Sequence, residues 1–255
     1  MSSTGREVAG ATRSHHHRPL LDNHRRAALY ATLLFVGTFA MLIGVGRHPT
    51  ELAPLTTLPP IGRIDANLYD AIVPQRTDVF TSLFKVFDLT GKGLFTIPLR
   101  IALLLALLVR RRWWAAMGFG LTWALSEIAI ETLKPWYHRG RPPLSLVHTA
   151  SFSFPSGHAT AGAAIAVAIV LGFMRPGHRR RVWFLIAILF SFAMAFSRVY
   201  LGAHWLSDVV TGVLLGSEAA VGSFALVESI RQRRLVDPID DQPEATDAPA
   251  GAPGT

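Results

Sequence analysis

Six apolar runs, separated by charged or loop-forming stretches, constrain the fold of this chain more than any other feature. The runs cover residues 27–46, 92–109, 113–133, 157–174, 182–199 and 205–226. Each is about as long as the 17 to 25 mostly apolar residues that an α-helix needs to cross a bilayer. Half of the residues are hydrophobic and the mean hydropathy is +0.34, which is typical of integral membrane proteins. We therefore predict an all-α integral membrane protein with a bundle of six transmembrane helices.

The basic residues indicate how such a bundle is oriented. Arginines cluster in the N-terminal tail and in the ranges 110–112, 175–181 and 231–234. With six spans, all four clusters fall on one side, which the positive-inside rule makes cytoplasmic. We predict a multi-pass protein of the plasma membrane with both termini in the cytoplasm. The net charge of +8 lies mostly in these clusters, and no basic groove with interleaved aromatic residues is present, so we expect no nucleic-acid partner.

The spans divide the chain into three parts. Residues 1–26 form a polar cytoplasmic tail, residues 27–226 the six-helix membrane domain, and residues 227–255 a second cytoplasmic tail that we expect to be disordered. No small-residue cleavage site follows the first apolar run, so we interpret it as a retained span.

A shorter helix is expected before the second span. Within the outer loop 47–91, apolar residues from Val79 to Phe87 follow helical spacing, and polar residues from Asp78 to Asp88 occupy the other side. This pattern is too short to span and predicts an amphipathic helix in the outer interface. A helix that packs on the loop without contacting lipid is the alternative, and the sequence leaves it open.

Three polar clusters mark the outer ends of the predicted spans. They read KPWYHRGRP (134–142), PSGH (155–158) and SRVYLGAHWLSD (197–208). The outer face should be poor in basic charge, so the cations there indicate an anionic ligand: Lys134, Arg139, Arg141 and Arg198. Of these, the guanidinium forks of Arg141 and Arg198 and the ammonium of Lys134 suit a phosphate dianion.

The same clusters hold groups that can bind and attack phosphorus. Ser156 stands at a helix N-cap position, and the N–H groups of Gly157 and His158 after it can cradle an anion. His204 and Asp208 are four residues apart, so the carboxylate can orient the imidazole as a nucleophile. Each feature alone has a structural explanation, such as capping or snorkelling. Their coincidence at three helix ends favours a phosphate site.

The patterns KxxxxxxRP (134–142), PSGH (155–158) and SRxxxxxHxxxD (197–208) resemble the three signature motifs of the type-2 phosphatidic acid phosphatases. These are membrane lipid phosphate phosphatases related to the vanadium-dependent haloperoxidases. The resemblance covers residues 134–208 in motif order, and the six-span layout extends it over residues 27–226.

The resemblance implies a metal-independent mechanism without a cofactor. His204 would form a phosphohistidine while Asp208 holds its ring, and His158 would protonate the leaving oxygen and then activate water. The phosphoryl oxygens would be bound by Lys134, Arg141, Ser156, Gly157 and Arg198. The site would lie on the extracytoplasmic face.

Several functions agree with these motifs. The leading one is hydrolysis of a membrane lipid phosphate or diphosphate, with an undecaprenyl-type isoprenoid diphosphate favoured over phosphatidylglycerophosphate and phosphatidic acid. A lipid phosphotransferase is a second hypothesis for an enzyme activity, and a lipid-phosphate binder or transporter is the non-enzyme alternative. The sequence leaves the oligomeric state and the route of lipid entry open.

Further predictions concern individual residues. Arg100 and Glu127 lie at similar depths in neighbouring spans, so we expect an intramembrane ion pair. Gly212 and Gly216 are spaced for close helix packing within the chain. Glu131 is a candidate for positioning Lys134. Arg139 lies between matched positions, and the sequence leaves open whether it binds substrate or faces water. No role can be assigned to Glu218.

Overall fold

The computed structural model describes residues 24–45 and 59–236, and every regular element in these residues is helical. Residues 1–23 and 237–255 lie outside the described part, and with them most of the two predicted tails. The elements are α1 (His24–Val45), α2 (Pro60–Ile72), the 3₁₀ turn η2 (Val73–Gln75), α3 (Asp78–Gly91), α4 (Gly93–Val109), α5 (Trp113–Tyr137), α6 (Gly157–Phe173), α7 (His178–Tyr200) and α8 (Leu206–Val236).

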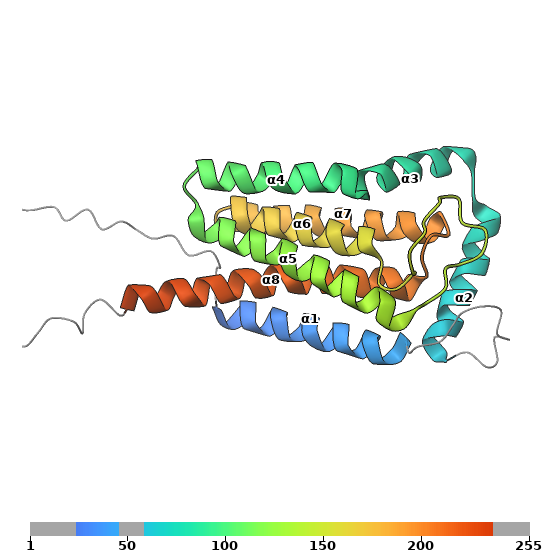
Figure 1. The fold of residues 1–255 in the computed structure, drawn as a ribbon, viewed down its shortest axis with the longest axis horizontal. Coiled ribbons are helices and arrows are strands. Elements are labelled where there is room, and N and C mark those ends of the chain that lie inside the picture. Colours follow the sequence, from blue (N-terminus) through green and yellow to red (C-terminus); the bar gives the residue numbers. More distant parts are fainter. Residues whose placement is uncertain (1–23, 46–58, 237–255) are drawn as a thin grey trace, which may run out of the picture.

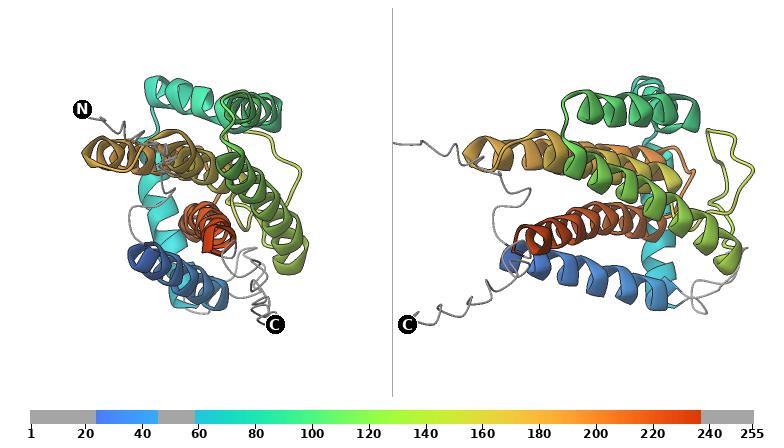
Figure 2. Two further views of the ribbon diagram at one scale, coloured as in Figure 1. Left: turned by 90° about the vertical axis from the view of Figure 1, so that its left-hand side faces the viewer. Right: turned by 60° about the vertical axis from the view of Figure 1, so that its left-hand side comes forward.

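Six of these helices run side by side along the long axis of the molecule (Figure 1): α1, α4, α5, α6, α7 and α8. α8 lies near the centre, where it packs against α1, α5 and α6 (Figure 2). Apolar residues such as Leu107, Phe119 and Phe224 fill the space between the helices. α2 crosses one end of the bundle, and α3 leads from that end into α4. The start of α1 and the end of α8 lie at the opposite end.

The predicted apolar runs correspond to these six helices. Three described stretches, Arg26–Val45, His178–Tyr200 and Leu206–Arg234, are long and apolar enough to cross a membrane. The pair α3 and α4, bent by 52°, counts as a fourth if it forms one span. α6 has only 17 residues, and α5 carries Glu127 and Glu131 within its apolar length. The count of six spans therefore stays a prediction.

Two features of the helices differ from the expectation. α8 continues to Val236, past the boundary that we expected at residue 226. α2 was not predicted, although Pro60 at its first turn and the stripe Ile61, Leu68 and Ile72 are typical of a helix that packs on one face. Leu68 and Ile72 pack on a small apolar cluster formed by α6, α7 and α8.

α3 occupies the place of the predicted amphipathic helix and packs against α7. Phe84 packs against Tyr200 in a tilted pair and against Phe196 edge to face, with ring centroids 4.8 and 5.6 Å apart. Val79 and Leu89 face outward, with 77% and 58% of their surface exposed. The polar side of α3 brings Asp88, which is buried, toward the bundle. The position of α3 in the membrane interface stays a prediction.

Gly212 and Gly216 of α8 let it approach α6 closely, in agreement with the predicted packing role of this pair. A Cβ atom at Gly216 would lie 2.2 Å from the Thr160 carbonyl oxygen, and one at Gly212 would lie 2.8 Å from the Ser156 carbonyl oxygen. Any side chain at either position would push the two backbones apart. This contact fixes the spacing between the start of α6 and the start of α8, where two of the three motifs lie.

The expected ion pair between α4 and α5 is confirmed. Arg100 donates through Nη1 to Glu127 Oε1, and its guanidinium lies 5.4 Å from the centroid of the Trp123 ring. Arg100 is 2% exposed, so its charge is held inside the bundle.

Breaking this pair should destabilise the protein. In Glu127→Ala the buried guanidinium loses its counter-ion, which we expect to cost up to about 3 kcal/mol and to lower the yield of folded protein. The double variant Arg100→Met/Glu127→Met removes both charges and should recover most of the loss. Thermal unfolding in detergent measures both effects. Equal stability of the wild type and Glu127→Ala would contradict the assigned role.

Candidate active site

The three motifs meet at the end of the bundle where α2 lies (Figure 1). The first runs from the end of α5 into the loop 138–156, the second begins α6, and the third spans the turn between α7 and α8. Backbone hydrogen bonds join them: the Ser156 N–H donates to the Asp208 carbonyl at 3.1 Å, and the Ser153 N–H donates to the Arg139 carbonyl at 2.8 Å. The convergence that the spacing predicted is therefore present.

Two cations of the first motif are held by one serine in the following loop. Lys134 Nζ lies 3.0 Å from Ser151 Oγ, and Arg141 Nη2 lies 3.3 Å from the same oxygen. Arg141 also donates to the carbonyl groups of Ser151 and Ala203, at 2.8 and 2.6 Å. Lys134 Nζ lies 3.9 Å from where a Cβ of Gly157 would be, at the start of α6. The ammonium of Lys134 thus faces the first turn of α6, while the Arg141 guanidinium lies against the turn that holds His204.

His204 lies in the turn just before α8, one turn ahead of Asp208. The ring is buried, with Nδ1 3.5 Å from Asp208 Oδ2 and Nε2 3.2 Å from Arg141 Nη1. A guanidinium can only donate, so Nε2 must accept and the ring proton belongs on Nδ1, facing the carboxylate. This tautomer leaves the Nε2 lone pair directed at the Arg141 guanidinium, and an unprotonated ring nitrogen is what an imidazole nucleophile needs.

The surroundings keep His204 neutral. Burial lowers the pKa of His204 to about 3, because it outweighs the opposing charge and hydrogen bond of Asp208. Burial and the charge of Arg198 lower the pKa of Arg141 to about 10, which leaves Arg141 protonated at neutral pH. A neutral imidazole thus lies beside a charged guanidinium.

The lowered pKa of His204 predicts a pH dependence of stability. Between about pH 3 and 6.5, the unfolded chain binds one proton that the folded chain does not, so stability is lost as the pH falls through this window. The slope is about 1.4 kcal/mol per pH unit. His204→Asn should lose less thermal stability than the wild type between pH 7 and 5, whereas variation of the exposed His148 should leave the wild-type slope. Equal slopes in His204→Asn and the wild type would contradict a buried neutral ring.

Asp208 is held in place by a buried network of hydrogen bonds that the sequence did not reveal. It accepts hydrogen bonds from Arg139 Nη1, from Ser153 Oγ, and from the Trp205 N–H at 2.9 Å. The other arm of Arg139 reaches Asp65 of α2, with Nη2 2.6 Å from Oδ2. Asp65 in turn accepts from the Ser207 N–H at 2.8 Å. Arg139, unassigned from the sequence, thus links α2 to the carboxylate that faces His204.

The charges in this network depend on each other. Arg139 and Asp65 are each 3% exposed. Burial by itself lowers the pKa of Arg139, but the charges of Asp208 and Asp65 together raise it. Burial raises the pKa of Asp65 although Arg139 opposes the change. One cation between two carboxylates therefore holds both in the interior.

Asp88 is a further site residue that was not singled out from the sequence. It sits near the end of α3, and its Oδ1 accepts from Arg198 Nη1. His158 Nε2 lies 3.0 Å from the Asp88 carbonyl oxygen and 3.4 Å from Oδ1, and Lys92 Nζ lies 3.1 Å from Oδ2. α3 therefore supplies the group that orients both the second-motif histidine and the third-motif arginine.

Several buried polar atoms of the site have no partner in the described part of the chain. They include Arg198 Nε and Nη2 and the hydroxyl of Ser156. Ser156 stands at the N-cap of α6 as expected, but its side chain makes no capping bond. Buried donors without acceptors are costly. The oxygens of a bound phosphate would supply acceptors at this position, next to the first-turn N–H groups of α6.

The described residues contain no group of three or more histidine, aspartate or glutamate side chains placed to hold a metal ion. The eight residues that the sequence predicted for the site all lie within this end of the bundle. The structure adds further residues to the candidate site: Asp65, Asp88, Arg139, Ser151, Ser153 and Ser207.

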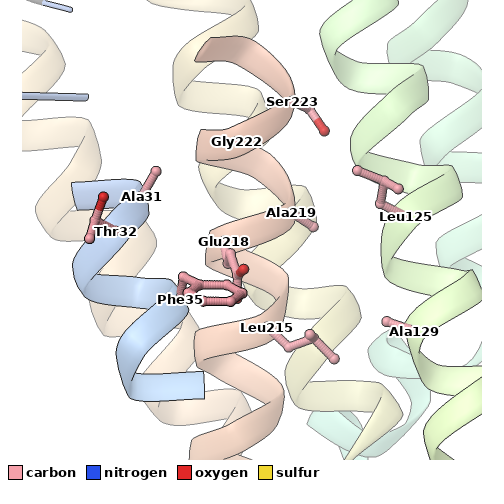
Figure 3. Close-up of a pocket in the computed structure, with 10 residues that line it drawn as sticks. All are labelled: Ala31, Thr32, Phe35, Leu125, Ala129, Leu215, Glu218, Ala219, Gly222 and Ser223. Atoms are coloured by element: carbon pink, nitrogen blue, oxygen red, sulfur yellow. The ribbon is translucent and has the colours of Figure 1, made fainter. Parts of the chain in front are cut away.

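A separate cavity of about 510 Å³ lies between α1, α5 and α8 (Figure 3). Its lining is mostly apolar, with Thr32, Glu218 and Ser223 as polar members. One carboxylate oxygen of Glu218 has no hydrogen-bond partner in the described chain. Leu215, which lines it, is seven residues beyond Asp208, or about 10 Å along the helix. The cavity is therefore distinct from the motif residues, and Glu218 belongs to it.

Comparison with known proteins identifies the family. A family model described as the PAP2 superfamily matches residues 115–231, a range that contains all three motifs. Decaprenylphosphoryl-5-phosphoribose phosphatase of Mycobacterium tuberculosis is 37% identical over 137 residues, which cover 51% of this chain and 69% of that protein. This chain belongs to the PAP2 superfamily. The sequence-based resemblance is thereby confirmed.

Other PAP2 relatives are similar over shorter shares of their length. Phosphatidylglycerophosphatase B of Bacillus subtilis is 32% identical over 132 residues, 49% of this chain and 64% of that one. Lipid A 4'-phosphatase of Bacteroides thetaiotaomicron is 28% identical over 156 residues, 54% of this chain. The match spans 64% of each of these two relatives, just under two thirds.

Solved PAP2 structures share the fold. The crystal structure of a transmembrane PAP2-type phosphatidylglycerolphosphate phosphatase from Bacillus subtilis matches with a TM-score of 0.65 at 24% identity, over 80% of this chain and 96% of that one. Aquifex aeolicus LpxE matches with a TM-score of 0.51 at 25% identity, over 63% of this chain and 94% of that one. With its apolar helices, this PAP2 chain is a membrane protein.

Proposed function

We propose that this PAP2 protein hydrolyses a phosphate or diphosphate group from a membrane lipid, through a phosphohistidine and without a metal ion. The observation that carries the proposal is the Arg141 guanidinium 3.2 Å from the buried, neutral His204 Nε2. A cation that binds phosphate beside an unprotonated imidazole nitrogen brings phosphorus and nucleophile together. The names of the relatives, several of which are lipid phosphatases, support it.

We assign each residue the role that the family resemblance implies. His204 attacks phosphorus through Nε2, the bond to the leaving oxygen breaks, and that oxygen takes a proton from His158. His158 then removes a proton from water, whose oxygen attacks the phosphohistidine and releases phosphate and free His204. Asp208 stabilises the ring as it becomes positively charged. The phosphoryl oxygens are bound by Lys134, Arg141, Ser156, Gly157 and Arg198.

Within the class, we propose an undecaprenyl-type isoprenoid diphosphate as the substrate, because a diphosphate carries a better leaving group and family members with this layout often serve carrier-lipid recycling. An undecaprenyl-diphosphatase of Sulfolobus acidocaldarius is 32% identical over 93 residues. Phosphatidylglycerophosphate and phosphatidic acid are the alternatives, and transfer to another lipid instead of water is the competing reaction.

We further propose that six spans place the site on the extracytoplasmic face, with both termini inside. All the arginine clusters in the described residues lie at the end of the bundle away from the site, which supports this orientation. The chain has no cysteine, so Ala150→Cys gives a single reporter in the site loop. Labelling of intact cells by an impermeant thiol reagent supports the orientation, and labelling only after lysis contradicts it.

Phosphate release from a panel of lipids in detergent tests the activity. The panel holds undecaprenyl diphosphate, phosphatidylglycerophosphate and phosphatidic acid, each with EDTA or vanadate in separate arms. We expect release that EDTA leaves unchanged and that vanadate, a mimic of five-coordinate phosphorus, inhibits. Loss of activity with EDTA would overturn metal independence, and labelled phosphate in a lipid product would indicate transfer.

Gly91, at the end of α3, lies in close contact with His158, so its substitution should affect turnover. A Cβ at Gly91 would lie 2.2 Å from His158 Cδ2, so Gly91→Ala must move the imidazole from its place on Asp88. Because small misplacements of catalytic groups are costly, we expect kcat to fall by about 10- to 100-fold with little change in KM. Gly93→Ala is the matched control, since its Cβ would meet only Ile97, at 3.6 Å. Equal kcat in both variants would contradict the role of His158.

A further inference from the structure

A basic pocket of about 430 Å³ lies at the end of the bundle opposite the candidate active site. It is lined by residues from the α4–α5 connection, the start of α5, the end of α6 and the end of α8. Five of the lining residues are arginines and none is acidic: Arg110, Arg111, Arg112, Arg175 and Arg231. The hollow therefore concentrates positive charge.

The turn between α4 and α5 gives the pocket its shape. Arg111 has a φ of +54°, and the Arg112 N–H donates back to the Leu107 carbonyl at 2.9 Å, so three consecutive arginines are held in a tight reversal. Arg112 Nη1 donates to the Phe173 carbonyl at 3.2 Å, which fixes the end of α6 against the turn. Arg110 lies over the Phe173 ring, 5.8 Å from its centroid. The fold thus holds the guanidinium groups of Arg110 and Arg112 against the end of α6.

These charges crowd one another. The pKa of Arg112 is lowered by its burial and by the charges of Arg110 and Arg175. Arg231 pairs with Glu228, 3.3 Å away on the same helix. A bound anion would relieve this repulsion.

Backbone donors point to the same chemistry. α5 begins at Trp113, and its N-cap residue Arg112 makes no side-chain capping bond. The first-turn N–H groups of Trp113, Trp114 and Ala115 have no acceptor within the helix, and all three residues line the basic pocket. A helix N-terminus favours anions. Guanidinium forks and a helix start together form a phosphate-binding combination.

The tryptophans place this combination at the level of lipid headgroups. Trp113 and Trp114 line the basic pocket beside the arginines, and Trp113 is 60% exposed. Tryptophan prefers the membrane–water interface, and basic pockets between transmembrane helices bind anionic headgroups. A soluble anion would not need this aromatic, membrane-level setting.

We propose that the basic pocket binds the phosphate-bearing headgroup of an anionic phospholipid, at a site separate from the candidate active site. The guanidinium groups of Arg111 and Arg175 and the first-turn N–H groups of α5 contact the phosphate, and the acyl chains lie along the outer surface of the bundle. The bound lipid joins the ends of α4, α5, α6 and α8 and stabilises the bundle.

Lipid binding by the purified full-length protein tests the proposal. Phosphatidylglycerol is titrated into micelles that otherwise hold phosphatidylcholine, and the rise in thermal unfolding temperature gives the half-saturating fraction. Phosphatidylglycerol is a phosphodiester, so a phosphatase for terminal phosphates does not consume it. We expect Arg111→Gln/Arg175→Gln to raise the half-saturating fraction roughly tenfold. If this pair fails to fold, Arg111→Gln alone takes its place.

The matched control is Arg179→Gln/Arg181→Gln, which removes the same charge from exposed residues at the same end without touching the basic pocket. We expect it to change the half-saturating fraction less than twofold. Equal weakening by both pairs would mean diffuse attraction and would overturn the proposal, as would no weakening by either. Inorganic phosphate at millimolar concentration should not compete; if it displaces the lipid, the pocket is a site for free phosphate and the lipid assignment is wrong.

Discussion

His204→Asn is expected to lower lipid phosphatase turnover by at least about 1000-fold, because the variant keeps a polar side chain at this position and removes the nucleophile. Asparagine cannot form a phosphoryl intermediate of comparable reactivity, and the remaining cations still bind substrate. Substrate affinity should therefore change much less than kcat. Phosphate release under substrate saturation measures kcat, and a separate binding measurement gives the substrate affinity.

His148→Asn is the matched control, because His148 is an exposed histidine in the neighbouring loop. We expect it to keep turnover within about twofold of the wild type. Turnover in His204→Asn that stays within tenfold of the wild type would rule out His204 as the nucleophile.

Arg139→Gln is expected to have the second largest effect, on stability and on turnover together. The substitution leaves Asp65 and Asp208 buried without the cation that lies between them. Removing one partner of a buried charge network costs about 3 to 5 kcal/mol. Thermal unfolding in detergent should fall steeply, and turnover measured at a temperature where the variant is folded should fall by about 100-fold, since Asp208 is no longer held against His204.

A second substitution separates the positioning role of Arg139 from its contribution to stability. Asp65→Asn/Arg139→Gln removes one of the two uncompensated carboxylates and should recover part of the lost stability, while kcat stays low because Asp208 still lacks its partner. Recovery of kcat in parallel with stability would show that Arg139 acts on the fold alone.

The motif residues were predictable because their chemistry is local. His204 and Asp208 are four residues apart, so spacing alone predicted that they lie on the same side of one helix. Ser156 immediately precedes an apolar run, which predicted its place at a helix N-cap. The apolar runs likewise predicted the helices, and α4 and α6 match them within one residue at each end. The arginine clusters all fall at one end of the predicted spans and the three motifs at the other, which predicted that the motifs would meet.

The residues that position the motif side chains were not predictable in the same way. Asp88 contacts Arg198 across 110 positions, and Asp65 contacts Ser207 across 142. No periodicity in one sequence reports such pairs. Asp88 is one polar residue on an amphipathic helix, and Asp65 lies in a helix that was missed. Arg139 lies between two motif positions, and only its burial reveals that it supports Asp208.

The most direct test of the central claim is detection of phosphate on His204 itself. Protein mixed with ³²P-labelled lipid diphosphate is quenched in alkali within milliseconds and cleaved with trypsin, which releases residues 199–231 as a peptide with His204 as its single histidine. We predict alkali-stable, acid-labile label on this peptide in the wild type and none in His204→Asn. Label on the peptide that carries His158, or turnover with no labelled peptide, would contradict the account.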